Sequence, residues 1–332
     1  MKRSVPYESI PNGWYAVAKS DELGLERLVE RKYFDREWVL WRTASGRAVM
    51  QDAYCPHLGA NLGDGCVRGE RIRCPFHGFE FSSTGECEKT AYGKRPPARA
   101  KLDGLPVVER DGVIFAWYHA EDAAPTWEPP AFSAPGFTDF IFLTRTFRGH
   151  PQETSENSSD LGHFGPVHSY AKAEMIGESV IEGHVLRARY RVMRNLDFIG
   201  LPGAAELDFA AEVHGLGYST VHAKVEQLGI DVRLLVLASP IDASNIDLRL
   251  GVRMKRLPIP GLTPLLHRFL LHAYVGDVDQ DIPIWKRKRY VERPALADGD
   301  GPIGTYRRYA SQFYSASRVV LPIVKSTNEA AE

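Results

Sequence analysis

Two short motifs that combine cysteine with histidine constrain this chain more than any other feature. The first is Cys55-Pro-His57, and the second, Cys74-Pro-Phe-His77, follows after sixteen intervening residues. A [2Fe–2S] cluster that has two cysteines on one iron and two histidines on the other needs this ligand set. Zinc accepts the same donors, but zinc fingers usually place the cysteines together and the histidines together. We therefore predict that Cys55, His57, Cys74 and His77 bind a [2Fe–2S] cluster.

The sequence around these motifs is typical of a small all-β module. Runs of β-branched and aromatic residues are separated by turn signals, and they cover 37–41, 48–50, 71–74 and 113–118. A stretch rich in proline and alanine at 120–137 then indicates a domain boundary. The length of 332 residues also favours two domains, for which we expect the ranges 1–120 and 121–332.

A second group of candidate metal ligands follows this boundary. Asp160 and His163 are three residues apart, which puts them on one face of a helix predicted for 152–164. Gly165-Pro166 is expected to end that helix, so that the chain turns and directs His168 back toward His163. Two histidines and one carboxylate, with coordination positions left open, form the facial triad of non-haem Fe(II) sites. Such a site would consume the electrons that the cluster delivers.

The acidic segment 276–281 offers the carboxylate of this triad. Pro283 favours a helix start, and an aspartate just before it could cap the helix while facing the metal. We expect Asp281 to be the ligand, with Asp277 as the alternative. Acidic runs of this kind are more often solvated helix caps, so the assignment depends on the histidines.

The remaining sequence after the boundary predicts strands followed by helices. The expected strands are 139–144, 188–192, 218–222, 232–237 and 246–250, and the expected helices are 262–275 and 282–292. This order predicts an α+β domain. A curved antiparallel sheet wrapped on a helix would enclose an apolar cavity for a hydrophobic small molecule.

Composition excludes several classes of partner and location. The net charge is −1, so nothing indicates binding to nucleic acid. No run of about 18 apolar residues predicts a transmembrane segment, and no apolar segment near the start predicts a signal peptide. Four cysteines are too few for a disulfide scaffold, so we expect a cytoplasmic protein. Because no glycine-rich dinucleotide motif is present, electrons from NAD(P)H should arrive through a separate protein.

Residues 13–118 resemble the Rieske family through the two Cys–His motifs. Rieske proteins of respiratory complexes usually have a further cysteine in each loop, where this chain has Ala60 and Phe76. The resemblance is therefore to the oxygenase or ferredoxin branch of the family. Cys66 and Cys87 match no ligand position, and we expect them to be structural thiols.

The C-terminal sequence resembles the steroid-acting branch of the Rieske non-haem iron oxygenases. The resemblance rests on the spacing of Asp160, His163 and His168, on Gln280-Asp-Ile-Pro-Ile-Trp-Lys-Arg-Lys, on Asp300-Gly-Pro-Ile and on Tyr309-Ala-Ser-Gln-Phe-Tyr314. This branch includes the oxygenase component of 3-ketosteroid 9α-hydroxylase and the cholesterol 7-desaturases. The resemblance implies a Rieske domain followed by a helix-grip catalytic domain, and a homotrimer. It also implies that mononuclear Fe(II) is held by His163, His168 and Asp281.

The same resemblance implies a function. The chain would be a terminal oxygenase that uses O₂, and electrons from a ferredoxin and/or a flavin reductase, to hydroxylate or desaturate a steroid-like substrate. Asp160 would bridge His163 of its own chain and His77 of a neighbouring subunit, and so connect the two iron centres. Two alternatives stay open at this point. One is the same chemistry on an aromatic or secondary-metabolite substrate, and the other is an electron-transfer protein with a non-catalytic C-terminal domain.

Overall fold

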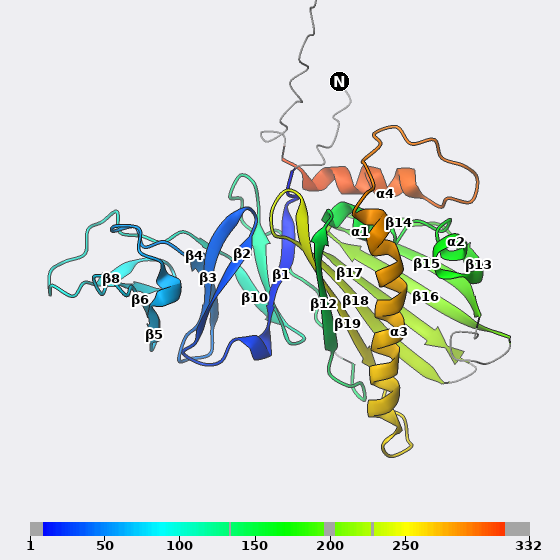
Figure 1. The fold of residues 1–332 in the computed structure, drawn as a ribbon, viewed down its shortest axis with the longest axis horizontal. Coiled ribbons are helices and arrows are strands. Elements are labelled where there is room, and N and C mark those ends of the chain that lie inside the picture. The colour runs from blue at the N-terminus through cyan, green and yellow to red at the C-terminus, as the bar shows by residue number, and fades with distance from the viewer. Residues whose placement is uncertain (1–8, 133, 196–202, 227–228, 316–332) are drawn as a thin grey trace, which may run out of the picture.

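The N-terminal part of the chain is built from three small antiparallel sheets, which lie together on one side of the molecule (Figure 1). The computed structural model describes residues 9–132, 134–195, 203–226 and 229–315. The sheets are β1 (Gly13–Lys19), β11 (Val113–Tyr118) and β10 (Val107–Arg110); β2 (Leu28–Tyr33), β3 (Arg36–Arg42), β4 (Ala48–Asp52) and β9 (Gly104–Leu105); and β5 (Cys66–Arg68), β6 (Arg71–Arg73), β7 (Glu80–Ser82) and β8 (Cys87–Lys89). Two single 3₁₀ turns are η1 (Ser20–Glu22) and η2 (Leu62–Asp64). Strands β1 and β11 are almost wholly buried because their side chains are apolar on both faces.

The C-terminal part holds an eight-stranded antiparallel sheet and the long helix α3 (Leu262–Trp285), which crosses one face of it (Figure 1). The strand order is β12 (Ile141–Arg148), β19 (Asn245–Met254), β18 (Ile230–Pro240), β17 (Tyr218–Val225), β16 (Ala204–His214), β15 (Val185–Asn195) and β13 (Tyr170–Met175), with β14 (Val180–Glu182) paired to β15. Leu271, Val275 and Ile282 of α3 pack on Leu248 and Leu250 of β19. This arrangement confirms the predicted α+β fold, an all-β module followed by a sheet gripped by a helix.

Two short helices stand where the sequence predicts a single helix over 152–164. Helix α1 (Pro151–Glu156) ends early, turns and irregular chain occupy 157–163, and α2 (Phe164–His168) follows. The expectation that Gly165-Pro166 ends a helix is wrong. These residues lie in the first turn of α2, where proline is tolerated because the first N–H groups of a helix have no intrahelical partner.

Helix α3 is continuous, whereas the sequence predicts separate helices at 262–275 and 282–292. Pro283 lies in its last turn and not at a helix start, so the expectation that Asp281 caps a helix is also wrong. A proline there removes only one intrahelical hydrogen bond, and packing against the sheet offsets the loss. Helix α4 (Ile303–Ala310) and the 3₁₀ turn η5 (Ser311–Phe313) complete the described chain. Among the described residues, no helix has both the length and the apolar character required to cross a bilayer.

The N-terminal sheets and the large sheet share an apolar cluster in which Trp14 packs with Tyr218. Tyr33 Oη donates a hydrogen bond of 2.6 Å to Asp247 Oδ2 on β19. Gly217 allows the close approach, because a Cβ at this position would lie under 3 Å from the Tyr15 ring and the Trp14 carbonyl. The connection between β11 and β12, where the predicted boundary at residue 120 falls, contacts this cluster, because the Trp127 carbonyl accepts a hydrogen bond of 2.6 Å from Trp14 Nε1.

Candidate metal sites

Each Cys–His motif lies in a loop that follows a strand of the small sheets. Cys55 comes after β4, and Cys74 directly follows β6. Backbone hydrogen bonds close both loops, because the Cys55 N–H donates to the Ala60 carbonyl and the Cys74 N–H donates to the Phe79 carbonyl. Gly78 has a φ of +65°, a conformation that glycine adopts without strain. The two loops can therefore present their side chains toward one place.

The loops bring like ligands together. The thiols of Cys55 and Cys74 are neighbours, and both residues are buried. The rings of His57 and His77 have centroids 4.8 Å apart, and the Phe79 ring stacks on His57 at 4.4 Å. A cluster with two sulfur ligands on one iron and two nitrogen ligands on the other needs this division. The residues present fit the predicted [2Fe–2S] cluster.

The surroundings of Cys55 disfavour its thiolate form in the absence of a metal. Burial, together with the neighbouring Cys74 thiol, raises the pKa of the Cys55 thiol to about 12. A free thiol in this setting is a weak nucleophile, because the thiolate is the reactive form. A bound metal cation would stabilise the thiolate and reverse the preference.

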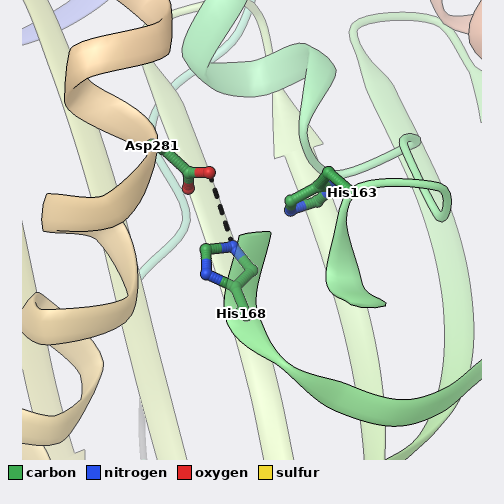
Figure 2. A group of neighbouring side chains, drawn as sticks. All are labelled: His163, His168 and Asp281. Atoms are coloured by element: carbon green, nitrogen blue, oxygen red, sulfur yellow. Dashed lines mark ion pairs between the residues drawn. The ribbon is translucent and has the colours of Figure 1, made fainter. Parts of the chain in front are cut away.

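Three side chains of the second predicted site converge in one place. Figure 2 shows His163 and His168 beside Asp281, which projects from α3. Each offers one ligand atom, and these atoms all lie within 4.8 Å of one another. His168 Nε2 is 3.4 Å from Asp281 Oδ1. His163 directly precedes α2 and His168 is its last residue, so one short helix positions both imidazoles.

Two residues to which the sequence assigned no role in the site hold these side chains in place. Gln280 Oε1 is 3.0 Å from His168 Nδ1, which leaves His168 Nε2 directed at Asp281. Asn157 Nδ2 donates a hydrogen bond of 3.1 Å to Asp281 Oδ2. Metal-binding histidines and carboxylates commonly have such supporting hydrogen bonds. Gln280 enters the sequence argument only as part of the resemblance motif 280–288, and no sequence feature distinguishes Asn157 from an ordinary surface residue.

Charge interactions couple the histidines to nearby aspartates. Partial burial lowers the pKa of His168, but the hydrogen bond and the charge of Asp281 outweigh burial and raise it overall. Burial raises the pKa of Asp160, but the neighbouring His163, whose backbone N–H donates a hydrogen bond to Asp160 Oδ1, outweighs burial and lowers it overall. Asp160 Oδ1 is 3.6 Å from His163 Nδ1, and that buried nitrogen has no hydrogen-bond partner within the described chain. A ring whose Nε2 bound a metal would present its Nδ1–H to this carboxylate, so the residues fit a mononuclear iron.

A cavity of about 230 Å³ lies beside these three ligands, and His163, His168 and Asp281 are part of its lining. Apolar side chains make up most of the remaining wall. They come from the large sheet and from α3, and they include Leu207, Phe209, Val221, Val232, Leu234, Leu270 and Ala273. An apolar cavity with a few polar groups at one end is typical of a site for a hydrophobic small molecule.

The alternative carboxylate, Asp277, has different partners. Arg194 Nη2 donates to Asp277 Oδ1 at 2.7 Å, and Tyr170 Oη donates to Asp277 Oδ2 at 3.3 Å. Asp277 also lines the cavity, but the group of converging ligands contains Asp281 and not Asp277. Asp277 and Asp281 are one helical turn apart on α3, so tertiary packing decides which carboxylate reaches the histidines.

The fold of this chain is similar to the folds of several solved structures. A dicamba monooxygenase bound to dicamba superimposes with a TM-score of 0.74 at 21% sequence identity, over 92% of this chain and 97% of that one. A caffeine-bound NdmA of Pseudomonas putida superimposes with a TM-score of 0.67 at 18% identity, over 90% and 89%. At these identities the likeness establishes the fold.

Comparison with protein families and curated proteins defines the relationship more closely. Residues 13–108 match the Rieske [2Fe-2S] domain, and residues 116–314 match the 3-ketosteroid 9α-hydroxylase C-terminal domain. The chain is 30% identical to a cholesterol 7-desaturase of Caenorhabditis elegans, over 92% of this chain and 77% of that protein. It is 29% identical to a probable 3-ketosteroid-9-alpha-monooxygenase oxygenase component of Rhodococcus rhodochrous, over 93% and 81%.

The chain therefore belongs to the Rieske non-haem iron oxygenases and, within them, to the family defined by the 3-ketosteroid 9α-hydroxylase C-terminal domain. It is an oxidoreductase, the terminal oxygenase component of a system in which a reductase or ferredoxin supplies electrons. Its cofactors are a [2Fe–2S] cluster and a mononuclear iron, with O₂ as co-substrate.

Proposed function

We propose that this oxygenase hydroxylates or desaturates a steroid-like molecule. One observation carries the proposal: the apolar cavity and the group formed by His163, His168 and Asp281 share one space. A hydrophobic substrate in this cavity would have its C–H bonds next to the iron. The names of the relatives, cholesterol 7-desaturase and 3-ketosteroid-9-alpha-monooxygenase, support a steroid as the class of substrate.

We assign the ligands of the two centres to the residues that the sequence predicts. His163, His168 and Asp281 would hold the mononuclear iron, and Cys55, His57, Cys74 and His77 would hold the cluster. When bound, the iron supplies O₂ activation and the cluster supplies electrons.

The protein's own side chains would prepare this site. Gln280 fixes the tautomer of His168, so that Nε2 is the nitrogen available for coordination. Asn157 occupies one oxygen of Asp281 and leaves the other directed at the site. The apolar walls exclude water and hold a rigid hydrophobic substrate by burial of its surface.

We also infer a homotrimer, in which Asp160 lies between His163 of its own chain and His77 of a neighbouring subunit. An ionised Asp160 beside His163 Nδ1 supports this assignment, as does the partial exposure of Asp160 and His77. A ferredoxin and/or a flavin reductase would be the electron donor. The cytoplasm is the proposed location, because Cys66 and Cys87, which are not proposed as cluster ligands, are free thiols, as is usual in a reducing compartment.

Turnover with candidate substrates tests the proposed function. The holoprotein, a surrogate reductase and NADH are supplied with a panel of sterols and 3-ketosteroids, and O₂ uptake and product mass are measured. At least one steroid is expected to stimulate O₂ uptake and to yield a product that is heavier by one oxygen atom or lighter by two hydrogen atoms. Asp281→Ala, which removes a proposed iron ligand, is expected to give no product.

The alternative substrate classes are part of the same test. Aromatic compounds and secondary metabolites are included in the panel, and coupled oxidation of these compounds alone would contradict the steroid proposal. The alternative of an electron carrier with a non-catalytic domain is disfavoured, because residues 116–314 match an oxygenase catalytic domain. Metal analysis distinguishes these two alternatives, because an oxygenase is expected to contain roughly three iron atoms per chain and an electron carrier roughly two.

A further inference from the structure

The first turns of α3 and the loop before them project beyond the strand ends of the large sheet (Figure 1). We refer to the exposed side chains of this region as the α3 tip, which consists of Lys255, Arg256, Ile259, Leu262, Leu265 and Arg268. Three of its members are large apolar residues in contact with solvent. Leu265 is 70% exposed, Ile259 is 58% exposed, and Leu262 is 38% exposed.

Packing among the residues that the structure describes does not account for this apolar face. The side of α3 that faces the sheet is formed by His267, Leu271 and Val275, which are buried. Leu262 and Leu265 are three residues apart and lie on the opposite side of the helix. A surface helix normally has a polar outer face, and exposed apolar groups that cluster mark an interaction site.

The charge of the α3 tip is positive. Residues 248–276 contain no aspartate or glutamate, and Lys255, Arg256 and Arg268 are exposed. No carboxylate of the described chain forms an ion pair with any of these three. Asp231, whose backbone carbonyl accepts a hydrogen bond from the Lys255 N–H, has its carboxylate 2.6 Å from His222 Nε2. Two exposed acids, Asp139 and Glu226, lie on neighbouring segments, and the three basic residues of the α3 tip outnumber them.

We propose that the α3 tip docks this protein onto an anionic lipid surface. Apolar side chains insert at the boundary between headgroups and acyl chains, and basic side chains around them attract anionic lipids. The α3 tip combines both features on one projecting segment. A second copy of the chain fits less well, since a symmetric contact between two such faces would set basic residues against basic residues.

With the α3 tip inserted in the lipid surface, the apolar cavity would lie close to that surface. Leu270 and Ala273 of the same helix line the cavity, and Leu270 is five residues, or about 8 Å of helix, from Leu265. A hydrophobic substrate could then enter without crossing water. The docking itself goes beyond the proposed function and does not depend on which substrate is oxidised.

Vesicle sedimentation tests the proposal with the intact holoprotein. The vesicles contain phosphatidylcholine, either alone or mixed with phosphatidylglycerol. The protein is expected to sediment with the mixed vesicles, to bind phosphatidylcholine alone much more weakly, and to dissociate as salt is raised toward ~1 M. Arg256→Glu/Arg268→Glu is expected to weaken binding by at least about 25-fold, or about fivefold for each basic residue lost. Leu265→Glu is expected to weaken it by roughly tenfold or more.

Matched variants in the segment that follows α3 provide the controls. Lys286→Glu/Arg287→Glu changes the net charge by the same amount at exposed positions, and Leu296→Glu replaces another exposed leucine. Both controls should sediment like the unaltered protein. The proposal is overturned if the unaltered protein does not sediment with mixed vesicles, or if the controls lose as much binding as the α3-tip variants.

Two further measurements test whether each variant is folded and whether the α3 tip is a contact between protein chains. Visible absorbance of the cluster and circular dichroism establish whether each variant is folded. If Arg256→Glu/Arg268→Glu does not fold, Arg256→Gln/Arg268→Gln, which removes the charges without reversing them, is used in its place. Light scattering records the oligomeric mass. If Leu265→Glu lowers that mass, the α3 tip is a contact between protein chains and the lipid proposal is wrong.

Discussion

His150 occupies the N-terminus of α1 as a buried, neutral imidazole. Its Nδ1 accepts a hydrogen bond from the Gln152 N–H, and its Nε2 is 3.0 Å from the Ser9 carbonyl oxygen. Burial lowers the pKa of His150 to about 4, although the hydrogen bond to Ser9 raises it in part. Protonation of Nδ1 would remove the acceptor on which the helix N-terminus depends.

Stability should therefore fall with pH in a defined window. The unfolded chain takes up a proton near pH 6.5, whereas the folded protein does so only near pH 4. The contribution of His150 to the free energy of unfolding is expected to be constant above pH 6.5 and to decrease as pH falls from 6.5 toward 4, by about 3 kcal/mol in total. Urea unfolding of His150→Asn, which keeps a side-chain acceptor that does not titrate, should lack this part of the pH dependence. Equal slopes for both proteins between pH 7 and pH 5 would show that His150 does not contribute.

Gln280 acts on the mononuclear site through His168. Gln280→Leu removes the acceptor for His168 Nδ1–H and leaves the ring free to rotate or to change tautomer. We expect iron affinity to fall by about 10- to 100-fold, as measured by competition with a chelator. Gln280→Glu, which keeps an acceptor at the same place, should retain most of the affinity. An unchanged affinity in the leucine variant would mean that Gln280 does not orient this ligand.

The end of α3 is tied to α1 and α4 by a buried cluster of charges. Glu153 and Glu156 of α1 are buried, and Lys288 Nζ lies 2.5 Å from Glu153 Oε2 and 3.1 Å from Glu156 Oε1. Arg307 of α4 donates to Glu156 Oε2 at 2.9 Å. Asn157, which supports Asp281, directly follows α1. The cluster thus holds three helices around the mononuclear site.

Removing one charge from this cluster should be costly. Lys288→Met leaves Glu153 buried without its cation, and we expect the free energy of unfolding to fall by roughly 2–3 kcal/mol. Lys286→Met, at an exposed position two residues away, should change it by less than about 0.5 kcal/mol. The double variant Glu153→Gln/Lys288→Met should regain part of the loss. Denaturant titration compares the three, and a loss equal to that of Lys286→Met would contradict the importance of the pair.

At the scale of the whole molecule, the proposed trimer makes Asp160 the connection between two iron centres. Asp160→Ala should leave both metals bound, because Asp160 is not one of their proposed ligands. We expect turnover to fall by at least about 100-fold, since His163 would lose its carboxylate partner and electron entry would be impaired. Iron content, cluster absorbance and product formation are measured on the same preparation. Normal turnover in this variant would exclude the bridging role.

The two metal motifs were predictable from the sequence because coordination depends on residue type and local spacing. Cys55 and His57 are held in one loop, and Cys74 and His77 in another, so short-range pattern and ligand chemistry suffice to predict the cluster. Strands such as β3, β11 and β18 were predictable for a similar reason, since runs of apolar β-branched and aromatic residues favour buried strands. Helix boundaries were less predictable. Tertiary packing maintains α3 through Pro283, which local propensity alone would place at a helix start.

What the sequence determined by itself is the chemistry: two loops with mixed sulfur and nitrogen donors, a pair of histidines, and acidic residues available to complete a triad. Tertiary structure alone decided that Asp281 and not Asp277 meets the histidines, that Asn157 and Gln280 support them, and that an apolar cavity lies beside them. The physical reason is distance along the chain. Residue type and spacing describe contacts within a loop or a turn. The contact between His168 of α2 and Asp281 of α3 joins residues more than a hundred positions apart, so it depends on how the large sheet and its helix pack.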